Sequence, residues 1–282
     1  KRLSEAQEQN SFLPAQAACQ GVAGAFSHRA CLEVFDQPDI QFYPQFEDVF
    51  RAVSLGERRY GIIPIENTLA GSVTDNYDLM LQYRLYIVGT VKVKIEHSLL
   101  VLPGTKLSDI KQVILMKGSA SVFDFLKAYP SIASHPFSNT AASAKFVAEQ
   151  NDPSIAAIGS LECARMYGLE VLAQSIQNRR DNFTRFVVLA REPVTHPGCN
   201  RISLVIRVKH QAGALYRALS RFADQEINLL KLESRPIPDS PFEFLFYWDF
   251  EGNMEQKNVI TALENLKQDI EYLKFLGNYP EQ

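Results

Sequence analysis

The stretch NRRDNFTRF, residues 178–186, gathers charged, amide and hydroxyl side chains directly before the apolar run VVLA. Thr184 carries a neutral hydroxyl that can donate a hydrogen bond, and Arg185 carries a planar guanidinium whose geometry suits a carboxylate. If the apolar run is a buried strand, both side chains are fixed on rigid backbone at its mouth. The pattern is compatible with a site for an anionic ligand. From the residues alone, a strand that simply has polar ends is the favoured interpretation.

A second polar group follows the apolar stretch GIIPI. The stretch IENTLAGSV, residues 65–73, places Asn67, Thr68 and Ser72 after a buried strand. A helix is expected to start near Ser72, and its first backbone N–H groups would be ready to bind a carboxylate. The alternative is an ordinary helix start in which a hydroxyl side chain caps these groups. Glu66 would repel an anion, so we assign it a structural hydrogen-bonding role.

Two further turns place polar groups at expected helix starts. The stretch GVAGAFS puts Gly21, Gly24 and Ser27 at a turn from a strand into a helix. Close approach of the backbone to an anion and a tight turn that needs positive φ are equally good explanations of these glycines. His28 is expected on the helix surface. In the stretch NTAASAK, Thr140 is expected to cap a helix.

Composition excludes several classes of function. The chain has 282 residues, enough for about two domains, and its apolar fraction of 46% is ordinary for a globular protein. The net charge of -3 argues against a nucleic-acid surface. We also expect no membrane segment and no nucleotide cofactor, because long apolar runs and glycine-rich phosphate motifs are missing. The four cysteines are far apart, which favours reduced thiols in the cytoplasm and no metal site.

The pattern of elements divides the chain into segments. Residues 1–16 are polar and are expected to form a linker or tail of a chain that continues beyond Lys1. Residues 17–192 alternate strands and helices, which predicts α/β structure with mainly parallel sheets. The stretch 192–200 contains proline and glycine and indicates a boundary. Residues 200–282 follow the order β-α-β-β-α-β, a ferredoxin-like domain that has no obvious cleft of its own and often pairs edge to edge with a second copy.

The motifs together resemble a known family. GVAGAFSHRAC (21–31), IPIENTLAGSV (63–73) and NFTRF (182–186) are similar to the motifs of prephenate dehydratases. GALYRAL and INLLKLESRP, closer to the C-terminus, resemble the phenylalanine-binding ACT domain that follows the catalytic part in that family. The resemblance covers nearly the whole chain. The long match YGIIPIENTLAGSV…YDLM resembles the type that is often fused behind a chorismate mutase helical domain.

The resemblance implies a catalytic domain over residues 17–192 that is built like a periplasmic binding protein. One lobe would hold residues 17–95 and 183–191, and the other would hold 96–177. The active site would lie between the lobes. Residues 200–282 would form the ACT regulatory domain.

The resemblance also implies the reaction and the residues that carry it. Prephenate would lose its ring hydroxyl and one carboxylate to give phenylpyruvate, and aromatisation would supply the driving force, so no cofactor is needed. Thr184 would donate to the departing oxygen, with the other catalytic residues being Arg185 and Asn67. Substrate-binding roles would fall to Thr68, Ser72, Ser27, Phe186 and Thr140.

One departure from the family pattern keeps rival functions open. The family usually carries a Ser-His-x-Gln-Ala stretch where this chain has MKGSAS, residues 116–121. Lys117 or Ser119 could contact substrate in place of the glutamine. Arogenate dehydratase is the alternative with the same chemistry. The alternative from another class is a non-catalytic sensor of aromatic acids.

Regulation by phenylalanine is implied for the C-terminal domain. The ligand would bind between two copies of that domain, so the expected assembly is a cytoplasmic homodimer or homotetramer. A plain dimerisation module is equally compatible with the sequence. The residues implied at the phenylalanine site are Gly213, Ala214, Leu215, Asn228, Glu233, Ser234 and Arg235.

Overall fold

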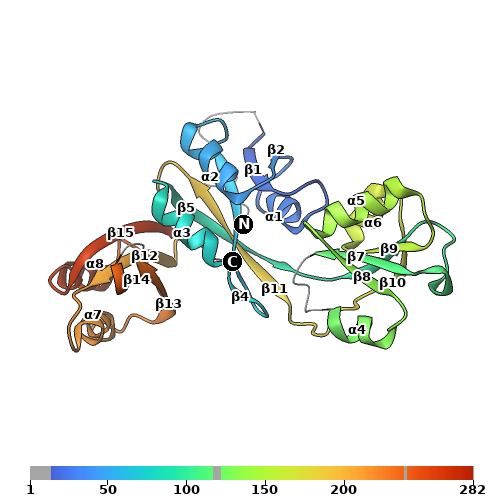
Figure 1. The fold of residues 1–282 in the computed structure, drawn as a ribbon. Coiled ribbons are helices and arrows are strands. Elements are labelled where there is room, and N and C mark those ends of the chain that lie inside the picture. Colours follow the sequence, from blue (N-terminus) through green and yellow to red (C-terminus); the bar gives the residue numbers. More distant parts are fainter. Residues whose placement is uncertain (1–13, 117–121, 238–239, 282) are drawn as a thin grey trace. The chain divides into compact units, whose positions relative to one another are not determined.

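The computed structural model describes residues 14–116, 122–237 and 240–281 (Figure 1). Lys117 and Ser119, the candidates to replace the missing glutamine, therefore lie outside the described residues, as does most of the predicted tail. The chain divides into two compact units. The first holds residues up to Val49, Ile62–Asn76 and Val91–Phe186, and the second holds Phe50–Gly61, Tyr77–Thr90 and the residues from Val187 onward. The division into domains and lobes that the sequence suggests stays a prediction.

The first sheet carries both polar stretches of the candidate site. Its strand order is β2-β1-β3-β11-β5, and the short strand β4 pairs with β3. Strand β3 is apolar up to its polar C-terminal end, and β11 is apolar after its polar start. Such apolar runs are expected of strands that are covered on both faces. The strands are β1 (Gln16–Gln20), β2 (Asp39–Tyr43), β3 (Tyr60–Asn67), β4 (Gly71–Ser72), β5 (Tyr86–Lys94) and β11 (Phe183–Ala190). The helices between them are α1 (Phe26–Val34), α2 (Phe46–Leu55) and α3 (Thr74–Gln82).

The second sheet lies wholly in the first unit and has the order β10-β6-β9-β7-β8. Apolar side chains cover both of its faces: Leu100, Ala144 and Ala157 belong to one cluster, and Leu99 and Val122 belong to the other. Its strands are β6 (Ser98–Val101), β7 (Gln112–Met116), β8 (Ala133–Phe137), β9 (Ile155–Gly159) and β10 (Glu170–Ala173). The connections hold the short helix η2 (Leu107–Asp109), α4 (Phe123–Ala128), α5 (Thr140–Gln150) and α6 (Leu161–Tyr167).

The start of α5 corrects one expectation. Asn139 caps this helix, because its side-chain oxygen accepts a hydrogen bond of 2.8 Å from the Ala142 backbone N–H. Thr140 is the first helical residue and is buried. The prediction that Thr140 caps the helix is therefore wrong by one position.

The third sheet confirms the predicted β-α-β-β-α-β order. Its strands pair antiparallel in the order β13-β14-β12-β15, with α7 and α8 packed on one face around Phe222, Trp248 and Phe250 (Figure 1). The two helices are amphipathic, and burial of their apolar sides against the sheet stabilises the arrangement. The elements are β12 (Arg201–Val208), α7 (Ala214–Ala223), β13 (Leu229–Ile237), β14 (Ser240–Glu251), α8 (Lys257–Leu266) and β15 (Ile270–Tyr279).

Helix α3 is held by side chains of this sheet within the second unit. Arg235 makes two hydrogen bonds, of 3.1 and 2.6 Å, to the carboxylate of Asp78. The Lys274 ammonium donates three hydrogen bonds of 2.8 Å to backbone carbonyls at the end of the helix, which belong to Met80, Leu81 and Tyr83. A cation at this position satisfies carbonyls that no helical N–H can reach and also interacts favourably with the helix dipole.

Candidate active site

Asn67 and Thr184, both predicted site residues, are joined directly. The Asn67 Nδ2 atom donates to the Thr184 Oγ1 atom at 3.0 Å. The Asn67 Oδ1 atom accepts two hydrogen bonds of 2.9 Å, from the backbone N–H groups of Leu69 and Ala70. These two bonds fix the side-chain amide, because only its oxygen can accept from backbone N–H groups. The amide hydrogens are therefore directed at the start of β11.

The Thr184 hydroxyl is placed as a hydrogen-bond donor. Thr184 is only 9% exposed, and its oxygen already accepts from Asn67. No other hydrogen bond of this hydroxyl is found in the part of the chain that the structure describes. A hydroxyl has one hydrogen, so that hydrogen is available to a bound ligand.

Arg185 does not share the environment of Thr184. Successive side chains of a strand point to opposite faces of the sheet, so Thr184 and Arg185 diverge. Arg185 is buried and its guanidinium lies 3.4 Å from the carboxylate of Glu66, whose neighbour Asn67 contacts Thr184. Glu66 therefore forms an ion pair with Arg185, which agrees with the structural role predicted for Glu66. The ion pair is compatible with a structural role for Arg185, and its contact with a substrate carboxylate stays a prediction.

Thr68 uses its hydroxyl to hold the second polar stretch. The Oγ1 atom donates to the Asp181 carbonyl at 2.7 Å and accepts from the Phe183 N–H at 3.0 Å. The Thr68 N–H also donates to the Phe183 carbonyl at 2.9 Å. The hydroxyl is thus engaged by backbone groups both as a donor and as an acceptor, and Thr68 connects the end of β3 with the start of β11. Ser72 lies in β4 opposite Glu66, and α3 begins after it, at Thr74.

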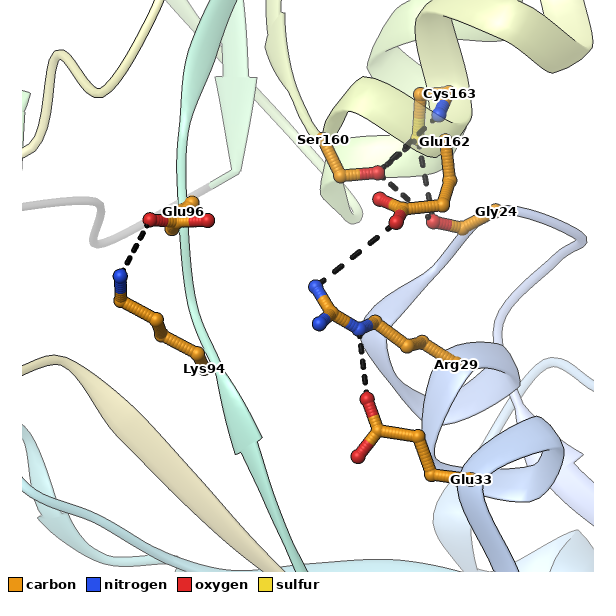
Figure 2. Close-up of polar contacts among 8 residues, drawn as sticks. All are labelled: Gly24, Arg29, Glu33, Lys94, Glu96, Ser160, Glu162 and Cys163. Atoms are coloured by element: carbon orange, nitrogen blue, oxygen red, sulfur yellow. Dashed lines mark hydrogen bonds and ion pairs between the residues drawn. The ribbon is translucent and has the colours of Figure 1, made fainter.

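The turn between β1 and α1 packs against α6 in the same unit. Gly24 has a φ of 86°, and its carbonyl accepts from the Cys163 thiol at 3.3 Å and from the Ser160 hydroxyl at 3.5 Å (Figure 2). A Cβ atom at position 24 would lie 3.2 Å from the Cys163 sulfur. The Gly24 N–H donates to His28 Nδ1 at 3.0 Å. This N–H is therefore engaged, and the geometry favours the tight-turn explanation of Gly24 over anion binding.

His28 and Arg29 are also engaged in this region. His28 lies on α1 as expected, but it is half-buried, and burial lowers its pKa. Arg29 lies 2.8 Å from Glu33 and 4.0 Å from Glu162, and Figure 2 shows its guanidinium between the two carboxylates. Lys94 pairs with Glu96 at 2.7 Å.

Ser27, Phe186 and Thr140 are all buried in the first unit. Among the described residues, no hydrogen bond joins Ser27 or Thr140 to Asn67 or Thr184. The structure therefore brings together the two polar stretches around residues 67 and 184. The remaining predicted substrate contacts stay predictions.

A pocket of about 410 Å³ lies within the C-terminal βαββαβ segment. The expectation that this segment has no cleft of its own is therefore wrong. The pocket contains two predicted residues, Ala214 and Leu215, and its lining combines phenyl side chains with cationic and anionic ones, of which Arg207 and Glu243 pair with each other. The lining residues that the motifs missed are Arg207, Val208, Lys209, His210, Gln211, Ala212, Glu243, Phe244 and Phe246.

The other predicted effector residues lie in the second unit outside the lining, with Gly213 directly between the lining residues Ala212 and Ala214. Gly213 precedes α7 with a φ of 76°. Glu233 is 3.8 Å from Lys231, and Arg235 is bound to Asp78. Asn228 and Ser234 are exposed, and none of these residues lines the pocket.

Neither metal-binding nor membrane-spanning features are found in the ranges that the structure describes. No group of three or more histidine, cysteine, aspartate or glutamate side chains there could hold a metal ion. Within the same ranges, no helix is both long and apolar enough to cross a bilayer. The four cysteines are buried and unpaired by disulfides.

Comparison with known proteins gives consistent matches. The family model described as prephenate dehydratase matches residues 17–194. Arogenate dehydratase 2 of Petunia hybrida is 39% identical over 280 residues, covering 93% of this chain and 71% of the relative. The crystal structure of a prephenate dehydratase from Arthrobacter aurescens in complex with L-Phe is 29% identical, with a TM-score of 0.86 over 94% of this chain and 89% of that chain. A structure described as GqqA, a quorum quenching acylase, is 31% identical, with a TM-score of 0.86 over 94% of this chain and 98% of that one.

Proposed function

Because the chain belongs to the prephenate dehydratase family, we propose that it converts prephenate to phenylpyruvate, carbon dioxide and water as a step in phenylalanine biosynthesis. The observation that carries this proposal is the hydrogen bond from Asn67 to the buried Thr184 hydroxyl. It supports a role for Thr184 as a donor, without a formal charge, that stabilises the leaving oxygen. The enzyme is thus a carbon–oxygen lyase that works with side chains alone.

The reaction balances without a redox partner. The C–C bond to the departing carboxylate breaks and its electron pair completes the aromatic ring, while the ring C–O bond breaks and releases hydroxide. Thr184 donates a hydrogen bond to that oxygen as negative charge develops on it, and the hydroxide takes its proton from solvent. A positioned donor of this kind typically contributes about 10²–10³ in rate, because it does not have to reorganise during the reaction.

Arogenate is the second candidate substrate. It carries an amine where prephenate carries a keto group, and the Petunia hybrida relative is named for it. The part of the molecule that Thr184 would contact is the same in both compounds. The proposed chemistry therefore holds for either substrate.

Cys163 is not favoured as the nucleophile of an acylase reaction. Acyl transfer through a cysteine needs a reactive thiolate. The Cys163 thiol beside Gly24 is fully buried, and burial raises its pKa, so it is a poor nucleophile.

L-Phenylalanine is proposed as the feedback inhibitor. The supporting observations are the pocket beside Ala214 and Leu215 and the L-Phe that is present in the Arthrobacter aurescens structure. A homodimer or homotetramer in the cytoplasm, formed through the C-terminal segments, completes the proposal. The predicted lobes, with the site between them, belong to it as well.

Steady-state kinetics of the purified chain test the proposed reaction. Prephenate and arogenate are supplied in parallel, and phenylpyruvate and phenylalanine are measured as the respective products. We expect turnover of prephenate with release of one carbon dioxide per product. A ratio of kcat/KM that strongly favours arogenate would change the substrate but keep the chemistry. Absence of turnover with both would favour the non-catalytic sensor.

A further inference from the structure

Asn182 is a buried amide beside the proposed catalytic pair. It is 3% exposed and directly precedes β11. Its side-chain Oδ1 atom accepts a hydrogen bond of 2.8 Å from Asn67 Nδ2. Its backbone carbonyl accepts from the Ile95 N–H at 2.8 Å, which fixes the position of the residue. The reaction as described above makes no use of this side chain.

The Asn67 side-chain amide has two hydrogens, but three hydrogen-bond acceptors lie within their reach. Its two hydrogens meet Asn182 Oδ1 at 2.8 Å, Thr184 Oγ1 at 3.0 Å and the Phe183 carbonyl at 3.1 Å. The amide cannot flip, because its oxygen is held by two backbone N–H groups. If one hydrogen is bound by Asn182, the second is confined to the side of Thr184 and Phe183.

We propose that Asn182 is a positioning residue for the dehydration, which acts through Asn67 to set the direction of the Thr184 hydrogen. By holding one Asn67 hydrogen, Asn182 directs the other to one lone pair of the Thr184 oxygen. The Thr184 O–H bond is then oriented away from Asn67. This inference rests on the proposed function, because it assigns a role within the same reaction.

Loss of the Asn182 oxygen has a defined consequence. The buried Asn67 hydrogen is left without its acceptor, which is costly, and both amide hydrogens are then shared between the Phe183 carbonyl and the Thr184 oxygen. The hydrogen bond that orients Thr184 is then no longer confined to one direction. Orientation of the leaving-group donor affects the transition state more than substrate binding, so the effect belongs in kcat and not in KM.

A double-mutant cycle tests the proposal. Asn182→Ala, Asn67→Ala and the double variant are compared with wild type, on whichever of prephenate and arogenate the enzyme turns over. We expect Asn182→Ala to lower kcat by about 10-fold or more with KM changed less than about 3-fold. In the Asn67→Ala background, Asn182→Ala should change kcat by less than about 2-fold, because the Asn67 amide through which Asn182 acts is already absent. Asn182→Asp keeps an acceptor oxygen of the same reach and should retain more turnover than Asn182→Ala.

Two controls separate this role from a loss of stability. Asn278→Ala removes a fully buried amide from the third sheet, so it should lower the melting temperature without changing kcat. Thermal melts of the Asn182 variants show whether they are folded under assay conditions, and Asn182→Asp supplies the comparison if Asn182→Ala is not.

Three outcomes would overturn the proposal. Equal effects of Asn182→Ala in both backgrounds would show that Asn182 acts independently of Asn67. An unchanged kcat in Asn182→Ala and Asn182→Asp would remove the role altogether. In both cases a large effect of Thr184→Ala would leave the proposed function standing. If Thr184→Ala itself has no effect, the proposed chemistry fails, and the positioning role fails with it.

Discussion

Mild acid is expected to destabilise this protein through His97. The ring is 3% exposed, lies edge-on to Phe26 with 5.8 Å between ring centres, and has an Nδ1 atom with no hydrogen-bond partner among the described residues. Burial lowers the pKa of His97 from 6.5 to about 4. A proton on this ring would therefore be a buried charge without compensation.

The sign and size of the effect follow from linkage. Between pH 6.5 and 4 the unfolded chain binds a proton that the folded chain does not, so the free energy of unfolding falls as the pH falls. The pKa difference corresponds to about 3 kcal/mol in total, of which about 2 kcal/mol is already lost between pH 7.5 and pH 5. His28 contributes in the same direction, because its pKa is also lowered by burial.

Urea unfolding at pH 7.5 and pH 5 measures this effect. His97→Gln cannot titrate, so it should lose about 2 kcal/mol less than wild type between the two pH values. His135→Gln, which replaces an exposed histidine, is the matched control and should behave as wild type. An equal loss of stability in wild type and His97→Gln would refute the reasoning.

Further predictions concern the helix clamp, the ion pair and the pocket. Lys274→Met leaves three carbonyls of α3 without their donor and should lower the free energy of unfolding in urea by about 1–3 kcal/mol; an unchanged midpoint would contradict the clamp. Because its guanidinium faces Glu66, Arg185→Lys should lower the melting temperature and change KM less than about 3-fold, whereas a large rise in KM would restore the carboxylate-binding role. Phe244→Ala should weaken phenylalanine binding by about 10-fold in calorimetry, and an unchanged affinity would place the effector elsewhere.

Truncation of the chain after Cys199 is a poor test of the phenylalanine site. Removal of the residues after Cys199 would delete Lys274 and Arg235, which hold α3. A truncated chain would therefore lose more than the pocket. A substitution in the pocket gives a cleaner test of effector binding.

The fold was accessible from sequence because its periodicities are strong. Alternation of apolar strands and amphipathic helices predicted the α/β class, and the βαββαβ order of the last segment is confirmed. Both Asn67 and Thr184 were predicted site residues at polar ends of apolar strands, but Asn67 ends β3 and Thr184 lies at the start of β11, so their direct contact needed the structure.

The remaining features depend on tertiary contacts or follow from the alternation of side chains along a strand. The period of two along β11 already separates Thr184 from Arg185, so their divergence could have been predicted. Asn182 lies in the NFTRF motif, but the motif did not indicate its role, because that role depends on a contact with a residue 115 positions away in the chain. The pocket likewise needs β14 beside the start of α7, a pairing that no local pattern encodes.

The turnover of Thr184→Ala and Thr184→Ser on prephenate tests the central claim most directly. The alanine variant lacks the donor and should lose about 10²–10³ in kcat, whereas the serine variant keeps a hydroxyl and should retain part of the activity. Thr105→Ala, at a threonine that is 7% exposed, controls for loss of a buried hydroxyl and should keep the wild-type kcat. Near-wild-type turnover in Thr184→Ala, with the protein folded, would contradict the account.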